Sequence, residues 1–127
     1  MTITGRWLHG ESFSGTVLRL DEPLSFWGGL DPATGTILDQ AHPQAGSSMA
    51  GKIVAMPGSR GSSGTPGVLG EAIRAGVGPA ALVITKADVN LLAGAMVAEA
   101  LYDIVCPVLL VDADTLDGLR TGDTVDA

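Results

Sequence analysis

The amino-acid sequence predicts an α/β fold in which a β-rich N-terminal half and a β-α-β-α-β C-terminal half form one compact β/β/α unit. After residue 50, three continuously apolar runs are each short enough for a buried strand, and helix-like segments separate them. Before residue 50, residues 2–8 and 13–20 alternate as half-buried strands do. We therefore expect a single α/β domain spanning residues 1–127.

The N-terminal half is expected to begin with a β-hairpin. Residues 2–8 and 13–20 are its two strands, and the turn at residues 9–12 joins them. Residues 36–39 are expected to form a short strand that leads to His42. No second histidine or carboxylate lies at metal-ligand spacing from His42, so we expect a structural hydrogen bond there rather than a general base or a metal ligand.

Between these strands, the sequence combines two aromatic side chains with paired glycines and a turn. Phe26 and Trp27 precede Gly28 and Gly29, and Asp31 begins a turn of the Asp-Pro-x-x-Gly kind. An aspartate before proline usually starts a turn. Gly28, Gly29 and Asp31 are also kept as candidates for shaping a site.

The C-terminal half is expected to alternate between strands and helices. Strands are expected at residues 52–55, 80–85, 107–111 and 123–125, and helical segments at residues 66–75, 91–101 and 114–119. Thr65 is the expected N-cap of the first helix, with Pro66 at its first position and Gly76 just past its end. Asp88 or Asn90 can cap the second helix.

The expected helix at residues 91–101 is apolar around nearly its whole circumference. Such a helix is either central to a core or buried at a subunit interface. A domain of this size offers a helix one core face, so we expect a partner to bury part of the rest.

Composition and charge exclude several classes of function. The formal net charge is −7, the pI is about 4.4, and the seven Lys and Arg residues are scattered, so the basic surface that nucleic-acid binding needs is missing. The N-terminus has no apolar leader-like stretch, and Glu99 and Asp103 interrupt the most apolar segment before it could span a bilayer. We expect a soluble, cytoplasmic protein with no nucleic-acid or membrane partner.

Cys106 is the one cysteine of the chain, and it lies in an apolar run just before Pro107. We expect a small buried hydrophobe rather than a reactive thiol. One thiolate cannot hold an iron–sulfur cluster, which ordinarily takes three or four cysteines. If the chemistry involves such a cluster, another chain must supply it.

The most informative stretch is Met56-Pro57-Gly58-Ser59-Arg60-Gly61-Ser62-Ser63-Gly64-Thr65-Pro66-Gly67, which joins an expected strand to an expected helix. Its hydroxyls, glycines and single guanidinium suit a loop that holds something small. A phosphate-binding P-loop would need a lysine followed by Ser or Thr where this chain has Thr65-Pro66. Gly61-Ser62-Ser63-Gly64 is one residue too short for the nucleophile elbow of serine hydrolases, and a phosphohistidine carrier would need a histidine here.

Two roles remain open for the serines of this loop. The positive end of the following helix, the free N–H groups and Arg60 would together stabilise a serine oxyanion, a carboxylate or a phosphate. One serine could then take a proton as a general base. Alternatively, Ser59, Ser62 and Ser63 only cap and turn the chain, as loop serines usually do.

The sequence resembles the small subunit of aconitase X. The resemblance rests on Phe26-Trp27-Gly28-Gly29-Leu30-Asp31-Pro32-Ala33-Thr34-Gly35, His42-Pro43, Gly51-Lys52 and Gly58-Ser59-Arg60-Gly61-Ser62-Ser63-Gly64, and Lys86-Ala87-Asp88 and Cys106-Pro107-Val108 agree with it. It covers nearly the whole chain. It implies a swivelling β/β/α domain, similar to the mobile domain of aconitase.

The resemblance also implies an activity. Members of the family are hydro-lyases that dehydrate cis-3-hydroxy-L-proline to Δ1-pyrroline-2-carboxylate or dehydrate mevalonate 5-phosphate. A large subunit carries the iron–sulfur cluster, which acts on the departing hydroxyl, and makes most substrate contacts. By resemblance, Ser62 is the catalytic base of the β-elimination. Arg60, Gly61, Ser63 and Ser59 are then expected to bind the substrate.

The resemblance therefore favours one subunit of a heterodimeric or larger dehydratase that acts on a small carboxylate. Cis-3-hydroxy-L-proline is the preferred substrate because the loop has no additional basic residue to meet a phosphate. The alternatives are the small subunit of a phosphomevalonate dehydratase, a structural or regulatory subunit that closes over its partner's site, and a stand-alone homo-oligomeric domain that binds a small acidic ligand.

Overall fold

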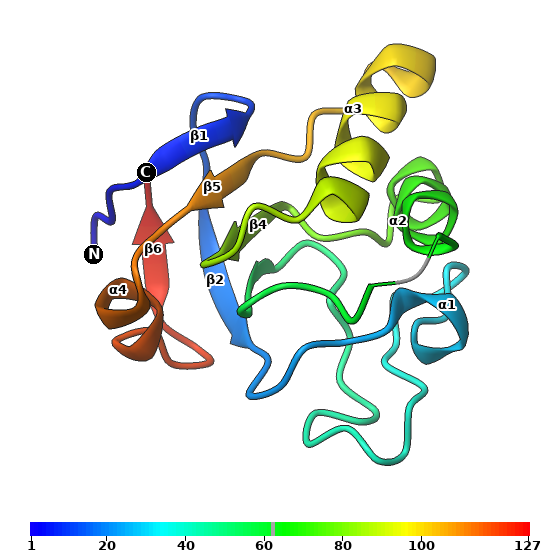
Figure 1. Ribbon diagram of the computed structural model, residues 1–127, viewed down its shortest axis with the longest axis horizontal. Helices are drawn as coiled ribbons and strands as arrows, with labels where there is room; N and C mark the ends of the chain where they lie inside the picture. Colours follow the sequence, from blue (N-terminus) through cyan, green and yellow to red (C-terminus); the bar gives the residue numbers. More distant parts are fainter. Residues whose placement is uncertain (62) are drawn as a thin grey trace.

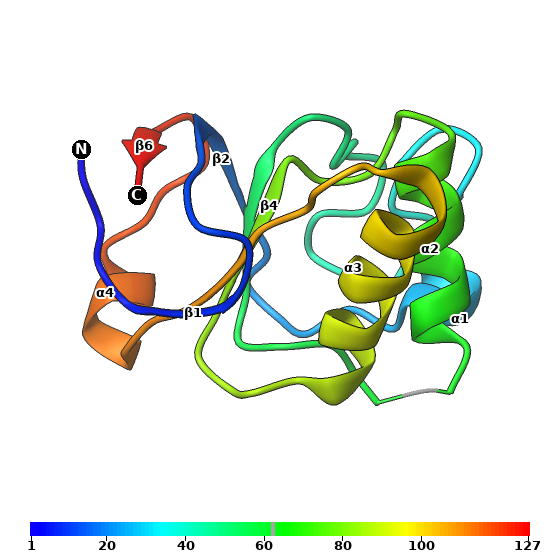
Figure 2. The same ribbon diagram turned by 90° about the horizontal axis from the view of Figure 1, so that it is seen from above.

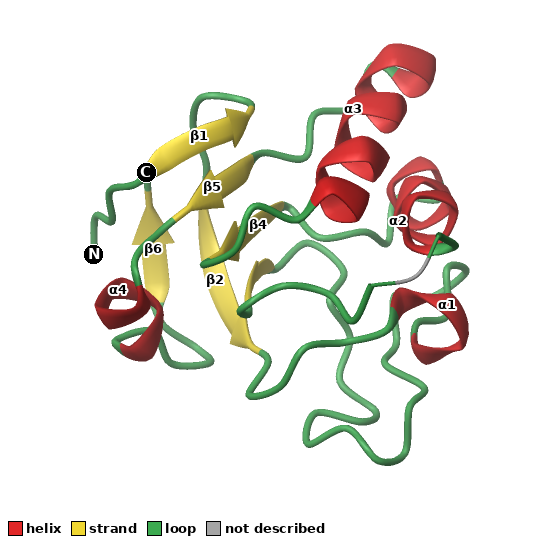
Figure 3. Cartoon of the chain, in the orientation of Figure 1, coloured by secondary structure: helices red, strands yellow, loops and turns green. Residues whose placement is uncertain are grey.

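The computed structural model describes every residue of the chain except Ser62. Its centre is a six-stranded sheet with the strand order β1-β5-β4-β3-β2-β6 (Figure 1). The strands are β1 (Arg6–His9), β2 (Ser14–Arg19), β3 (Ile53–Ala55), β4 (Ala81–Ile84), β5 (Val108–Leu110) and β6 (Thr124–Asp126). The helices are α1 (Phe26–Gly29), α2 (Thr65–Arg74), α3 (Val89–Tyr102) and α4 (Ala113–Asp117) (Figure 3).

The sheet is parallel at its centre and antiparallel at its edges. Strands β2, β3, β4 and β5 run parallel, while β1 and β6 run antiparallel to β5 and β2. The sheet curls so far that the segment before β1 meets β6, where the Ile3 N–H donates to the Asp126 carbonyl at 2.9 Å. Figure 2 shows β1, β6 and α4 at one end of the molecule and α1, α2 and α3 at the other. This arrangement confirms the predicted α/β fold.

The central strands bury side chains on both faces, which explains their continuously apolar sequences. Along β4, Leu82 and Ile84 join the cluster beneath α2 and α3, whereas Ala81 and Val83 join the cluster that Leu116 of α4 covers. Each fully buried side chain of the size of leucine contributes roughly 1.5–3 kcal/mol to stability. The sheet therefore has two apolar cores, one on each face.

The predicted N-terminal β-hairpin is wrong, although both of its strands exist. β1 pairs with β5, and β2 pairs with β3 and β6, so β1 and β2 are not neighbours in the sheet. The turn between them does reverse the chain, and Gly10 (φ +72°) packs against Pro107. Alternation along the sequence indicates strands but not their partners. The apolar strands β3 and β5 need a neighbour on both sides, and β2 and β1 fill those places.

The strand predicted at residues 36–39 is also wrong. Thr36 and Ile37 make only isolated bridges, to Ser48 and Leu30 respectively. Gly35 just before this segment has a φ of +77°. This left-handed conformation bends the backbone where a longer ladder would have to begin.

The helices of the C-terminal half are confirmed, with one correction to their capping. Asp88 caps α3, because its Oδ1 accepts hydrogen bonds from the N–H groups of Asn90 and Leu91. Thr65 is not the N-cap of α2 as predicted. The N-cap is Gly64, and Thr65 is the first helical residue, fully buried against the core. Burial of this side chain takes precedence over its capping preference.

Helices α2 and α3 pack closely because α3 carries a glycine at the contact. A Cβ on Gly94 would lie 2.9 Å from Cδ2 of Leu69 and 3.2 Å from the Pro66 carbonyl oxygen. Pro66 belongs to the first turn of α2, so this contact also fixes the start of that helix.

A valine at position 94 is expected to destabilise the chain. Gly94→Val should lower the free energy of unfolding by about 1–3 kcal/mol, because the Pro66 carbonyl can move only if α2 moves. Gly67→Ala in α2 is the matched control: this position is exposed and a Cβ meets nothing, so stability should rise by about 0.5–1 kcal/mol. Thermal unfolding followed by circular dichroism measures both changes. A tolerated valine would contradict the close packing.

One face of α3 is left uncovered. Leu91, Gly94, Ala95 and Ala98 face the core. Met96, Val97 and Leu101 are exposed, as are the following Tyr102, Ile104 and Val105. The helix thus has one core face, as expected, and burial of the other face by a partner stays a prediction. Within the described part of the chain, no helix has the length and apolar character needed to cross a membrane.

Candidate functional site

The glycine- and serine-rich loop lies where the parallel strands end. It leaves β3 at Ala55 and enters α2 at Thr65 (Figure 1). The segments that leave β2 and β4 flank it, because those strands pair with β3 on either side. In open and in closed α/β sheets with parallel strands, ligands bind beyond the carboxyl ends of the strands. This edge of the sheet is therefore the candidate site.

The segment after β2 holds the loop on one side. Ser59 and Leu24 form an isolated parallel β-bridge, and the Arg60 N–H donates to the Leu24 carbonyl at 3.0 Å. The Arg60 guanidinium donates through Nη2 to Glu22 Oε1 at 3.1 Å. The two side chains are 59% and 48% exposed, so water screens this pair and its strength is low. Arg60 can exchange Glu22 for an anionic ligand at little cost.

Asp88, which follows β4, holds the loop on the other side. Its Oδ2 accepts hydrogen bonds from the Ser59 N–H at 2.8 Å and from the Ser59 hydroxyl at 2.7 Å. A serine hydroxyl has one proton to donate, so Ser59 keeps only acceptor capacity for a ligand. An alkoxide at Ser59 would lie against a carboxylate, and like-charge repulsion opposes its formation. Ser59 is therefore unsuited to act as a base.

Two further residues of the loop are open to solvent. Gly61 and Ser63 are exposed, and Ser62, the predicted base, lies outside the described residues. Gly64 lies directly against Trp27, since a Cβ on Gly64 would be 3.0 Å from Trp27 Cε3. The Trp27 side chain is 69% exposed. A large aromatic ring thus borders the end of the loop, where a ligand or a partner can contact it.

The glycine pair predicted to shape the site supports this tryptophan. Gly28 has a φ of +76°, which favours glycine, and it reverses the backbone directly after Trp27. Gly29 is buried, and a Cβ there would lie 3.3 Å from Cδ1 of Leu24. The pair therefore lets α1 bring Trp27 against Gly64 while it packs on the residue that anchors the loop.

Asp31, the third residue predicted to shape the site, stabilises its own turn. Its Oδ1 accepts a hydrogen bond from the Ala33 N–H at 2.9 Å, and its Oδ2 accepts one from the Thr34 hydroxyl at 3.0 Å. These are the contacts of an aspartate that begins a turn.

His42 makes the structural hydrogen bond that the sequence predicts. The side chain is buried, and its Nδ1 accepts a hydrogen bond from the Gln44 N–H at 3.0 Å. Nε2 therefore carries the proton and donates to the Glu22 carbonyl at 2.9 Å. Because Glu22 pairs with Arg60, His42 fixes the backbone that carries the ionic partner of the loop.

The start of α2 favours negative charge beside the loop. Its free N–H groups and its dipole point toward the loop residues that precede it. The Thr65 hydroxyl in this first turn is buried and forms no hydrogen bond with any described residue. The helix end and Arg60 thus contribute positive charge to a loop that also contacts the carboxylates of Glu22 and Asp88.

Cys106 is buried in the core, and its thiol has low reactivity. Its side chain is almost inaccessible, and burial raises the pKa of the Cys106 thiol from 9.0 to about 12. The thiolate that reacts with electrophiles and binds metals is therefore scarce near neutral pH.

Alkylation is expected to distinguish the folded from the unfolded thiol. At about pH 8, iodoacetamide should leave Cys106 unmodified in the native chain and label it after denaturation, as mass spectrometry would show. The unfolded thiol also ionises at lower pH than the folded one, so the unfolded state binds fewer protons in alkaline solution. The free energy of unfolding should then fall as the pH rises from 9.0 toward about 12. Rapid labelling of Cys106 in the native chain would contradict the burial of its thiol.

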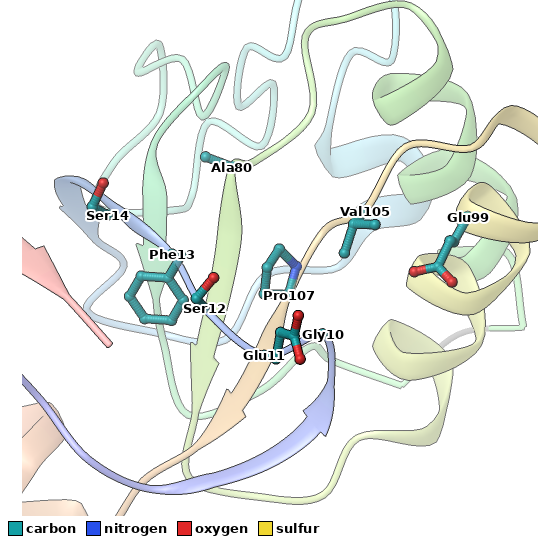
Figure 4. A pocket seen from close by; sticks show the side chains of 9 residues that line it. All are labelled: Gly10, Glu11, Ser12, Phe13, Ser14, Ala80, Glu99, Val105 and Pro107. Carbon is teal, nitrogen blue, oxygen red and sulfur yellow. The ribbon is translucent and has the colours of Figure 1, made fainter.

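A large cavity lies at the opposite edge of the sheet and is separate from the loop. It measures about 640 Å³ and is bordered by Ala80 and Pro107, which precede β4 and β5 (Figure 4). Glu11 and Glu99 give it acidic character. Among the described residues, none that lines it belongs to the loop, so it forms no part of the candidate site.

Comparison with known proteins places the chain in one family. Residues 2–127 match the family described as the aconitase X swivel domain. A cis-3-hydroxy-L-proline dehydratase of Pseudomonas aeruginosa is 41% identical over 106 residues, which are 84% of this chain and 18% of that protein. A phosphomevalonate dehydratase small subunit of Methanocella arvoryzae is 30% identical over 125 residues, which are 98% of this chain and 91% of that protein.

A solved structure agrees with these matches. The crystal structure of Thermococcus kodakaraensis aconitase X in its holo-form is similar with a TM-score of 0.85 and 31% sequence identity, over 96% of this chain and 87% of that chain. The chain thus spans less than a fifth of the length of the Pseudomonas dehydratase and nearly the full length of the Methanocella small subunit.

Proposed function

Because the chain belongs to the aconitase X swivel-domain family, we propose that it is the small subunit of a hydro-lyase and that its serine loop supplies the catalytic base. The position of the loop carries this proposal. It lies at the carboxyl edge of the sheet, beside the positive end of α2, with Arg60 at its rim. Elimination next to a carboxylate needs a base and a cation that holds the carboxylate. Arg60 is a cation at this edge, and Ser62 is the base that we propose.

The proposed enzyme has a second, larger chain. The matching region of the Pseudomonas dehydratase is 18% of that protein, and the Methanocella relative is itself named a small subunit. We propose that this chain assembles with a large subunit into a heterodimer or a larger heteromer. The exposed apolar side chains of α3, among them Met96, Val97 and Leu101, support such an assembly. A cytoplasmic location of the assembly stays a prediction.

We propose that the iron–sulfur cluster of the enzyme belongs to the larger chain. The present chain has one cysteine, and Cys106 is buried with its pKa raised to about 12, so its residues do not fit a cluster that needs several thiolates. Within the described residues, no three His, Cys, Asp or Glu side chains are grouped so that they could hold a metal ion. The steps assigned to this chain are proton transfer and substrate binding.

In the proposed reaction, Ser62 removes the proton α to the substrate carboxylate. The proton moves to the Ser62 alkoxide oxygen, and the C–H electron pair forms the C2=C3 double bond while the β-hydroxyl leaves with its bonding pair as hydroxide, which is protonated to water. Transfer of the ring N–H proton to C3 then converts this enamine to the imine Δ1-pyrroline-2-carboxylate. Serine can accept this proton only if its oxyanion is stabilised. N–H groups of the glycine-rich loop and the positive end of α2 can provide this stabilisation. Arg60 pairs with the carboxylate, and Gly61 and Ser63 contribute an N–H group and a hydroxyl.

Cis-3-hydroxy-L-proline is the substrate that we favour. The Pseudomonas dehydratase named for it is 41% identical to this chain. Arg60 is the only basic residue of the loop sequence, which suffices for a carboxylate but leaves no cation for a phosphate. Mevalonate 5-phosphate is the second candidate, because the Methanocella subunit named for it matches this chain in length.

Co-expression with the large chain tests the proposed function. The two chains should purify together in fixed stoichiometry, and the complex should convert cis-3-hydroxy-L-proline to Δ1-pyrroline-2-carboxylate while neither chain alone does. Conversion of mevalonate 5-phosphate instead would favour the second candidate. Full activity of the large chain alone would refute a catalytic role for this chain. A lone chain that forms homo-oligomers and binds a small acid without the large chain would point to a stand-alone binding domain.

A further inference from the structure

We infer that Asp88 is the positioning residue of the serine loop, a role that rests on the proposed function of that loop. Asp88 follows β4, and Ser59 follows the neighbouring parallel strand β3. One carboxylate joins the two: Oδ2 accepts both the N–H and the hydroxyl proton of Ser59, at 2.8 and 2.7 Å. Oδ1 accepts the N–H groups of Asn90 and Leu91 at the start of α3.

These contacts exceed what helix capping requires. Asp112 shows the ordinary case: its Oδ1 accepts the Thr115 N–H at 2.8 Å, and its further hydrogen bond comes from the Thr115 side chain of the same helix. A neutral Asn or Ser caps a helix about as well as Asp. In Asp88 the cap occupies one oxygen, and the second oxygen is devoted to the loop. The negative charge strengthens both bonds to Ser59, because charge-assisted hydrogen bonds are roughly twice as strong as neutral ones.

The loop backbone is held close to Asp88 on the approach to Ser59 as well. A Cβ on Gly58 would lie 3.3 Å from Asp88 Oδ2, so a side chain at this position would crowd the contact. The Pro57 carbonyl accepts the Lys86 N–H at 3.2 Å, which ties the start of the loop to the segment that carries Asp88. Residues 57–60 are thus fixed to the start of α3 on one side and, through Leu24, to the β2 segment on the other.

We call the two hydrogen bonds from Ser59 to Asp88 the clamp. Through the clamp, Asp88 affects the reaction without contacting the substrate. Ser59 precedes Ser62 by three residues in the sequence, so we expect a displacement of the Ser59 backbone to displace the proposed base as well. A displacement of about 1 Å at a reacting group costs roughly 100-fold in rate. Loss of the clamp should therefore lower kcat and leave KM nearly unchanged, because Arg60 keeps its own anchor at Leu24.

The variant Asp88→Asn separates the clamp from the cap. Its oxygen still accepts the α3 N–H groups, whereas its NH2 group faces the Ser59 N–H and cannot accept from it. Hydrogen–deuterium exchange of the full chain should accelerate at least about 10-fold in residues 58–64 and stay unchanged at the start of α3. In the complex with the large chain, kcat should fall about 10- to 100-fold. Asp112→Asn is the same change at a helix cap that has no contact with the loop. It should alter neither the exchange rate of residues 58–64 nor kcat.

Ser59→Ala provides an independent second variant. It removes the hydroxyl bond but keeps the N–H bond, so its effects should be smaller than those of Asp88→Asn, and the double variant should behave like Asp88→Asn alone. Unchanged loop exchange in Asp88→Asn, or additive effects in the double variant, would overturn the inference. An inactive wild-type complex would instead refute the proposed function, while the exchange measurement would still decide whether Asp88 holds the loop.

Discussion

Ser62→Ala is expected to lower kcat of the two-chain complex by about 10²- to 10⁴-fold, the usual contribution of a positioned general base. Alanine keeps the loop backbone and removes the one oxygen proposed to accept the α-proton. KM should change little, because Arg60 and the loop N–H groups remain. Steady-state kinetics on purified complexes, with product formation followed directly, measures the effect.

Ser63→Ala is the matched control for this substitution. Ser63 is the adjacent serine of the same loop, it is exposed, and it has the proposed role of a substrate contact. Its removal should change KM and leave kcat within a few-fold of wild type. Both variants should bind the large chain as wild type does. A reversal of the two results would move the assignment of the base from Ser62 to Ser63.

Arg60→Gln is expected to raise KM by about 10- to 100-fold, the value of one hydrogen bond to a charged group. In the structure the guanidinium lies at the rim of the loop, and its partner among the described residues is the exposed Glu22. In the proposed reaction, a substrate carboxylate replaces that partner and keeps the contact in the transition state, so kcat should change less than KM. Initial rates over a range of substrate concentrations separate the two constants.

Glu22→Gln is the control that removes the other half of the same ion pair. It takes away the group that competes with the substrate for Arg60, so KM should fall slightly or stay constant. Exposed pairs of this kind contribute about 0–1 kcal/mol to stability, so both variants should fold normally. If Arg60→Gln and Glu22→Gln gave the same small effect, Arg60 would have only a surface role and no contact with the substrate.

The strands and helices of the C-terminal half could be predicted because their signals are local. β4 is a short apolar run, and α3 begins directly after an aspartate that caps it. The partners of β1 could not be predicted in the same way. Pairing of β1 with β5 joins segments about 100 residues apart, and the turn at residues 9–12 suggested a nearer partner. The packing needs of the buried central strands determine the sheet order.

The candidate site, too, could be predicted only where its signals are local in the sequence. The composition of the loop pointed to an anion-stabilising site, and resemblance to a family selected Ser62 within it. The groups that hold the loop have no local signal. Asp88 was predictable as a helix cap, but its contact with Ser59 joins residues 29 positions apart. Glu22 and Trp27 likewise reach the loop only through the fold.

Transfer of the α-hydrogen tests the central claim most directly. The complex is incubated with cis-3-hydroxy-L-proline that carries deuterium at the α-carbon, and the release of deuterium into water is measured. We predict that the wild-type complex releases it at least as fast as product forms, and that an assembled, cluster-loaded Ser62→Ala complex releases it at about 1% of that rate or less. Release by Ser62→Ala at the wild-type rate would contradict the claim and identify this chain as a structural or regulatory subunit.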